Sequence, residues 1–126
     1  MVPTDLRYTK DHEWVRREGD EATVGITEYA AGQLGDIVFV ELPDMGRTLA
    51  QFSTFGVVES VKAVSDLFAP VSGEVATTNA ALTGSPELVN SDPYGEGWMI
   101  RLKLSEPAEV DELLDAAAYD ALIAAG

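Results

Sequence analysis

Short extended segments, each closed by turn-forming residues, run through this chain and restrict it to a mainly β fold. The strongest spans residues 36–42 (DIVFVEL) and ends in the proline-led turn PDMG. Residues 98–104 (WMIRLKL) alternate between apolar and polar, which is typical of a strand with one buried face. Similar segments are expected at residues 12–17, 22–26, 55–60, 67–69 and 71–76. The pattern predicts a sheet or barrel, and Gly73 marks a place where another strand approaches closely.

Helices are expected in two parts of the chain. Thr27 has the character of an N-cap for a short helix over 28–34, which Gly35 ends. Residues 105–107 (SEP) open a C-terminal helix, and Asp115 caps a second one over 116–124. Their inward faces are expected to consist of Val110, Leu113, Leu114, Tyr119, Leu122 and Ile123. Residues 83–97 hold two prolines and three glycines, so we expect a long surface loop there.

Composition narrows the class of protein. The 126 residues suit one domain, and 46% hydrophobic content indicates a globular chain. A net charge of −14 disfavours nucleic acid or an anionic membrane as partner. The absence of cysteine excludes disulfides, thiol catalysis and zinc–thiolate sites. Since the N-terminal residues MVPTDLRYTKDHEW contain no apolar run of signal-peptide length, a cytoplasmic protein is expected.

Motifs for catalysis or metal binding are weak in this sequence. His12 is the only histidine, and beside Glu13 it can be read as half of an acid–base pair. A structural or binding role is favoured, because the run DHEW has neither a recognised nucleophile motif nor the HExxH spacing of a metal site. The glycines fit no phosphate-binding pattern. We therefore expect neither a metal site nor catalytic residues.

Lys62 is the most unusual residue of the chain, because it is the only basic residue between Thr48 and Ile100. The flanking segments predict a hairpin with Lys62 at its tip. Three interpretations are open: an ordinary exposed lysine, a Schiff-base or general-base lysine, and a handle for a covalent cofactor. The second needs a depressed pKa, which the neighbouring carboxylates Glu59 and Asp66 oppose.

The segment GVVESVKAVSDLFAPVSGEV around Lys62 resembles the swinging-arm hairpin of lipoyl and biotinyl domains. Biotin carriers usually have methionine on both sides of the lysine, whereas Val61 and Ala63 match the lipoyl version. Three further segments, YTKDHEWV, VGITEYAAGQLGDIVFVELPDMG and LTGSPELVNSDPYGEGWMIRLKL, extend the likeness from about residue 6 to 123. Together they resemble the family of glycine cleavage system H proteins.

This resemblance implies a hybrid barrel-sandwich of the lipoyl/biotinyl type, mainly β, with a short internal helix and C-terminal helices. It implies one lipoyl-carrier domain over residues 1–126, with the lipoyl hairpin at about 55–76 and the C-terminal helices at about 106–124. Lipoate would be attached to Lys62, and the protein would be a monomeric, non-catalytic carrier. The implied partners are a pyridoxal-phosphate-dependent glycine decarboxylase, a tetrahydrofolate-dependent aminomethyltransferase, dihydrolipoamide dehydrogenase and the lipoate-attaching enzymes.

The resemblance also implies roles for residues outside the tip. Glu59 is a candidate for recognition by the lipoate-attaching enzyme, or it merely flanks the turn. A cleft that retains the aminomethyl-loaded arm would use Glu13 and Asp66 as counter-ions, with Asp11, Ser65 and Gln33 as further candidates. Some relatives have a histidine where this chain has Gln33. Two alternatives within the class are a homologue that relays lipoyl groups to other complexes, and a biotinyl carrier.

Overall fold

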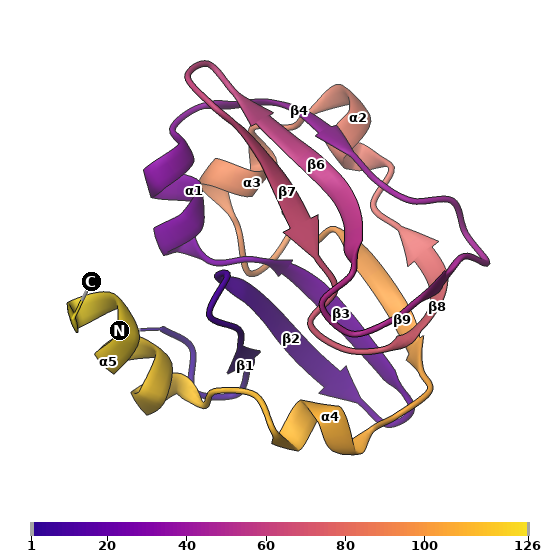
Figure 1. Cartoon of the computed structure of the whole chain (residues 1–126). Helices are drawn as coiled ribbons and strands as arrows, with labels where there is room; N and C mark the ends of the chain where they lie inside the picture. The colour runs from indigo at the N-terminus through magenta and orange to yellow at the C-terminus, as the bar shows by residue number, and fades with distance from the viewer. Residues whose placement is uncertain (1, 126) are drawn as a thin grey trace.

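The computed structural model describes residues 2–125 and divides its strands between two antiparallel sheets (Figure 1). The larger sheet has the strand order β1-β2-β3-β9-β8-β5, and the smaller has the order β4-β6-β7. The larger sheet consists of β1 Arg7–Tyr8, β2 Glu13–Glu18, β3 Glu21–Ile26, β9 Ile100–Leu104, β8 Gly73–Thr78 and β5 Thr48–Leu49. The smaller consists of β4 Ile37–Glu41, β6 Thr54–Ser60 and β7 Val64–Phe68. The expected mainly β sandwich is confirmed.

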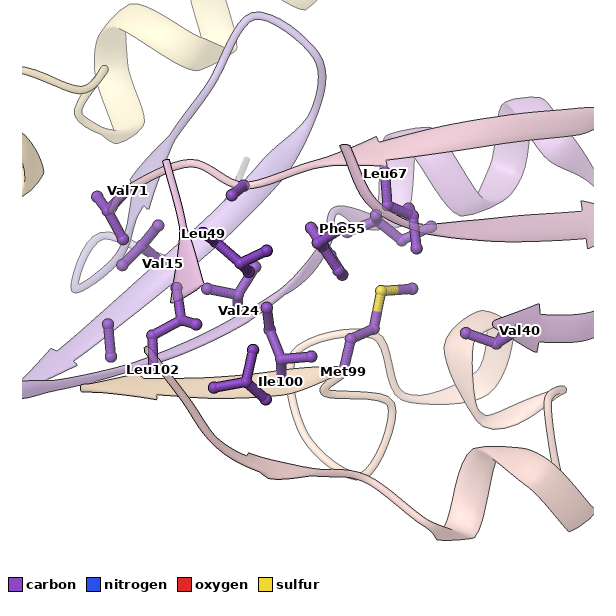
Figure 2. Packing of buried hydrophobic residues seen from close by; sticks show 14 of the residues in the cluster. Val15, Val24, Val40, Leu49, Phe55, Leu67, Val71, Met99, Ile100 and Leu102 are labelled. Atoms are coloured by element: carbon purple, nitrogen blue, oxygen red, sulfur yellow. The ribbon is translucent and has the colours of Figure 1, made fainter. Parts of the chain in front are cut away.

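The inner faces of the two sheets share one hydrophobic core. In Figure 2, Phe55 and Leu67 of the smaller sheet converge with Val24 and Ile100 of the larger sheet. Each of these side chains is buried, and full burial of an aliphatic or aromatic side chain contributes about 1.5–3 kcal/mol. The alternation predicted for residues 98–104 brings Ile100, Leu102 and Leu104 into this core, although the strand begins only at Ile100.

Gly73 confirms the expected close approach of a neighbouring strand. It pairs with Leu104, and a Cβ at this position would lie 2.5 Å from the carbonyl oxygen of Lys103. Strand β8 therefore belongs to the larger sheet. The β6–β7 hairpin is consequently shorter than the hairpin predicted at about 55–76. Its strand pairing ends with the Thr54–Phe68 pair, and Pro70 just beyond it has no N–H to extend the ladder.

The internal helix α1 spans Glu28–Leu34, as the sequence predicted. The Thr27 side chain accepts a hydrogen bond from the N–H of Ala30, and the N–H of Gly35 donates to Ala31. The end of the helix at Gly35 has φ of 82°, a left-handed conformation that suits glycine. Local capping chemistry was sufficient to define this element.

The long surface loop predicted over residues 83–97 is interrupted by helical turns. Two short helices, α2 (Ala81–Gly84) and α3 (Leu88–Ser91), overlap this stretch. Leu82 and Val89 are buried in the shared core, so tertiary packing supports turns that the glycines and prolines alone disfavour. The strand predicted at 67–69 also differs, because β7 begins at Val64, immediately after the hairpin tip.

The C-terminal helices are α4 (Ala108–Asp111) and α5 (Ala116–Ala125), and Asp115 caps α5 by accepting from the N–H of Ala118. Leu113 and Leu114 follow α4 rather than belonging to it. Helix α5 packs on a second apolar cluster, formed mainly by Leu6, Tyr8, Trp14, Ala116 and Tyr119. Figure 1 shows α5 beside the N-terminal segment, away from the hairpin tip. No helix within residues 2–125 has the length and apolar character to cross a membrane.

Candidate functional site

A tight turn at the end of the β6–β7 hairpin displays Lys62. The Ser60 N–H donates to the carbonyl of Ala63 at 2.8 Å, which closes the turn. The Ser60 hydroxyl oxygen accepts from the N–H groups of Ala63 and Lys62, at 3.0 and 3.3 Å. One serine side chain thus satisfies two backbone donors of the tip. The Lys62 side chain is exposed, as the hairpin prediction required.

The loop after α1 supports this tip. The Val61 N–H donates to the carbonyl of Asp36 at 3.1 Å. The stem of Lys62 passes over Gly35, and its Cε lies 3.4 Å from the position a Cβ of residue 35 would occupy. The bare backbone of Gly35 therefore provides a shallow cradle for the lysine stem. Figure 1 shows the hairpin tip projecting beyond α1 at this point.

Asn90 of α3 holds the supporting loop in place. Its amide nitrogen donates to the carbonyl of Gly35 at 2.8 Å, and its amide oxygen accepts from the N–H of Ile37 at 2.9 Å. Sequence reasoning missed this positioning residue, because it placed Asn90 in a surface loop. The only signal was an asparagine directly after the apolar pair Leu88–Val89, which is common in turns as well.

Glu13 is the most perturbed carboxyl group of the structure. Its side chain is only 1% exposed; its Oε1 accepts from the Thr9 hydroxyl at 2.6 Å, and its Oε2 lies 3.4 Å from the N–H of Phe68. Burial raises the pKa of Glu13 to about 7, and the two hydrogen bonds oppose this only in part. A cation brought beside Glu13 would favour its ionised form. Such a buried carboxyl group is suited to retaining a small ammonium ion.

The surface next to Glu13 is hollowed. A cavity of about 360 Å³ is lined by residues 8–11, which include Lys10 as well as Asp11, by the exposed ring of Phe52 and by residues that follow α4. Phe52 has φ of 66°, an uncommon backbone conformation for a residue with a side chain. Thr9 connects the two features, because it lines this hollow and its hydroxyl donates to the Glu13 carboxyl group.

His12 lies in a hydrogen-bonded group of structural character. Its Nδ1 is 2.7 Å from the Tyr119 hydroxyl, which is 2.8 Å from the hydroxyl of Thr27, the N-cap of α1. Burial lowers the pKa of His12, with Asp11 opposing the shift. The Tyr119 hydroxyl thus links α5 directly to the N-cap of α1 and also binds the His12 ring. This favours the structural interpretation of His12.

The remaining predicted site residues do not gather in one place. Asp66 is exposed on the outer face of β7, whereas the half-buried Ser65 points to the opposite face of the same strand. Gln33 is exposed on α1, and Asp11 is exposed beside the hollow. Within residues 2–125, no hydrogen bond joins any of these four side chains to Glu13. Glu59 lies half-buried on the outer face of β6, three residues before Lys62.

The accessible group of this site is the amine of Lys62. In the described residues, no three histidine or carboxylate side chains lie close enough to hold a metal ion. What the arrangement provides is an accessible amine on a rigid turn, with a bare backbone beneath its stem.

Comparison with known proteins gives a consistent result. Residues 6–125 match the family model described as glycine cleavage H-protein. A glycine cleavage system H protein of Symbiobacterium thermophilum is 62% identical over 125 residues, which cover 99% of this chain and 98% of the relative. One from Magnetococcus marinus is also 62% identical, over 95% of this chain and 86% of its own length. The crystal structure of a glycine cleavage system H protein from Mycobacterium marinum superposes with a TM-score of 0.90 at 41% identity, covering 98% of this chain and 99% of that one.

Proposed function

The chain belongs to the glycine cleavage H-protein family, the lipoyl carriers of the glycine cleavage system, and on this premise we propose that Lys62 is its attachment residue. The observation that carries the proposal is the display of Lys62 on a turn closed by Ser60, in the β6–β7 hairpin. An enzyme that forms an amide needs an accessible amine with a defined approach. The turn supplies both, because the backbone of the tip is fixed while the side chain stays exposed.

The residues around Lys62 fit a lipoyl group in amide linkage. Amide formation removes the charge of the amine, and Gly35 leaves room beneath the stem for the uncharged arm. When attached, the dithiolane supplies the disulfide and thiol chemistry that a chain without cysteine lacks. The chain's own contribution is to present the arm on a rigid hairpin and to shelter its far end.

In this proposal the carrier has no turnover of its own. Its partners are a pyridoxal-phosphate-dependent glycine decarboxylase that loads an aminomethyl group, a tetrahydrofolate-dependent aminomethyltransferase that removes the methylene carbon, and dihydrolipoamide dehydrogenase. The acidic surface, with a net charge of −14, suits successive encounters with basic docking patches on such enzymes.

Glu13 is the group we assign to retention of the loaded arm. An aminomethyl group carries a primary ammonium ion, and Thr9, which donates to the buried Glu13 carboxyl group, lines the neighbouring hollow. Arrival of the ammonium ion would favour ionisation of Glu13. The attraction between the two charges would then offset part of the free energy that burying the carboxylate costs. Asp11 adds a second carboxylate at the rim. Asp66, Ser65 and Gln33 remain further candidates for this role.

A reconstituted exchange assay tests the proposal. Lipoylated wild-type protein, mixed with glycine decarboxylase and labelled bicarbonate, is expected to support exchange of label into glycine. Lys62→Arg keeps the positive charge and the fold but is expected to support no exchange, because its guanidinium forms no lipoyl amide. Exchange by Lys62→Arg at the wild-type rate would overturn the proposal. Borohydride trapping of a carbonyl compound on Lys62 would instead favour a Schiff-base enzyme.

A further inference from the structure

The outer face of the hairpin sheet carries an alternating array of apolar and acidic side chains. Strand pairing aligns Phe39, Glu59 and Val64 in one row across β4, β6 and β7. The adjacent row consists of Glu41, Val57 and Asp66. Each apolar side chain is thus flanked by a carboxylate in its own row and by another in the neighbouring row. We call these six residues the hairpin face.

The hairpin face is open to solvent, although it is built partly from large apolar side chains. Phe39 is 49% exposed and Val64 is 68% exposed, whereas Val40, Val58 and Leu67 on the inner face of the same strands are buried. Val38, the extra residue of a β-bulge in β4, and Val61 at the tip are also exposed and extend the apolar area. Exposed apolar side chains gathered in this way are typical of an interaction surface.

The charge pattern of the hairpin face specifies its partner. All three polar positions are carboxylates, and Lys62 at the tip is the only basic residue between Thr48 and Ile100. A complementary surface would place arginine or lysine side chains between apolar ones, so that each carboxylate meets a cation as the apolar groups are buried. A second copy of this acidic face would bring carboxylates against carboxylates. The partner is therefore a protein of different charge.

The position of the hairpin face, next to Lys62, favours one of the several enzymes that bind a lipoyl carrier. The Glu59–Val64 pair is the last of the hairpin ladder, directly before the turn that holds Lys62. An enzyme that works on the far end of the arm acts at a distance from the tip. The enzyme that forms the amide must instead bring an activated lipoyl carbonyl to bonding distance of Nζ, so it must cover the residues beside the tip. There Nζ forms the C–N bond, releases a proton, and the activating group departs with the electrons of its bond to carbon.

Resting on the proposed function, we propose that the hairpin face is the docking surface for the enzyme that attaches the lipoyl group to Lys62. Phe39 and Val64 supply the apolar contacts, and Glu41, Glu59 and Asp66 pair with its basic side chains. This assigns Glu59 a place in a surface rather than an isolated role. Phe39 lies on a neighbouring strand, 23 positions before Lys62 in sequence, so inspection of the residues around the lysine does not find it.

Initial rates of lipoylation test this assignment. The unlipoylated full-length protein is titrated into a purified lipoate–protein ligase with lipoate and ATP. For Phe39→Ser and Val64→Ser we expect KM to rise about tenfold with kcat little changed, as expected when a central apolar contact is lost. The matched control is Met45→Ser: Met45 is 68% exposed but follows the opposite end of β4, beyond the Glu41–Val57 pair.

Three outcomes separate the possibilities. A KM for Phe39→Ser and Val64→Ser equal to that of Met45→Ser, with all three variants folded by circular dichroism, would overturn the docking assignment and leave the proposed function intact. Failure of the wild-type chain to accept lipoate would overturn both. The lipoylated variants are also expected to support glycine decarboxylase within about twofold of the wild type. A larger loss there, with unchanged lipoylation, would assign the face to that enzyme and overturn the proposal.

Discussion

The hairpin tip and the N-terminal strands differ in how far their key ionisable side chains are exposed to water. At the hairpin tip, Lys62 is exposed, and only the backbone around it is fixed by Ser60 and Asp36. Around the N-terminal strands, Glu13 is 1% exposed and hydrogen-bonded to Thr9. Attachment needs an accessible amine, whereas retention of a reactive cation needs shelter from water. The proposed function requires both in one chain, with Lys62 at the tip of the smaller sheet and Glu13 in the larger one.

The contrast predicts that changes near Glu13 alter stability, while changes near Lys62 alter modification. The largest expected stability effect is that of pH on Glu13. Burial raises its pKa from the usual 4.5 to about 7, so the folded state holds a proton that the unfolded state releases. The stabilisation that protonated Glu13 contributes is therefore complete below about pH 4.5 and is lost as pH rises through about 7. Over this range the free energy of unfolding falls by roughly 3 kcal/mol in total.

Urea unfolding of Glu13→Gln and wild type between pH 4.5 and 8 measures this effect. The variant is expected to lose less stability than wild type as pH rises, because glutamine does not titrate but still accepts from Thr9. Glu18→Gln, at the exposed end of the same strand, is the control and should follow the wild-type curve. Parallel curves for Glu13→Gln and wild type would show that Glu13 is not held protonated.

Tyr119→Phe addresses the packing of α5 against the rest of the chain. The Tyr119 hydroxyl contacts both His12 Nδ1 and the fully buried Thr27. Its removal takes the partner of the half-buried His12 Nδ1 and one of two hydrogen bonds of the Thr27 hydroxyl, which still accepts from the Ala30 N–H. We therefore expect a loss of about 1.5 kcal/mol in the free energy of unfolding. Lipoylation should proceed at the wild-type rate. Slower lipoylation of the folded variant would show that the hairpin tip and the N-terminal strands are coupled.

Gly35→Ala and Gly32→Ala form a matched pair on α1. Gly35 has φ of 82°, so a side chain there is expected to cost about 1 kcal/mol, and its Cβ would contact the stem of Lys62 and slow lipoylation by restricting that stem. Gly32 lies within the helix, and no atom lies within 4 Å of the position that a Cβ would occupy there. Alanine should therefore stabilise the folded protein by about 0.5–1 kcal/mol. Equal effects of the two substitutions on unfolding and on lipoylation would contradict the cradle described for Gly35.

Ser60→Ala is expected to have the smallest effect on stability. It removes the hydroxyl that accepts from the N–H groups of Lys62 and Ala63, both of which are near water. We expect a loss of about 0.5–1 kcal/mol and a measurable fall in lipoylation rate, because the tip becomes less ordered. Hydrogen exchange at the two amides provides the readout, and unchanged protection would argue against the role assigned to Ser60.

Local sequence signals predicted the elements that depend on few residues. Thr27 and Gly35 define α1 through capping, and the apolar alternation of residues 98–104 places β9 in the core. Elements that depend on distant partners escaped prediction. The strands β1 and β5 have two residues each and exist through pairing with β2 and β8, and α3 forms where Val89 reaches the core. Asn90, which positions the loop beneath Lys62, could not be recognised without that fold.

For the candidate site, the sequence located the exposed Lys62 but not how Glu13 is buried. The family resemblance suggested Glu13 and Asp66 as counter-ions, with Ser65 as a further candidate, yet strand alternation sends the Asp66 and Ser65 side chains to opposite faces. The burial of Glu13 depends on contacts from Thr9 and from Phe68, which is 55 positions away. Only the assembled sheets bring these groups together.

The mass of the Lys62-containing peptide, from protein isolated out of the organism that makes it, tests the central claim most directly. The account predicts a mass increase equal to one lipoyl group in amide linkage, located on Lys62 by fragmentation. A biotinyl adduct on Lys62, or an unmodified Lys62 peptide from cells whose other lipoyl proteins are modified, would contradict it.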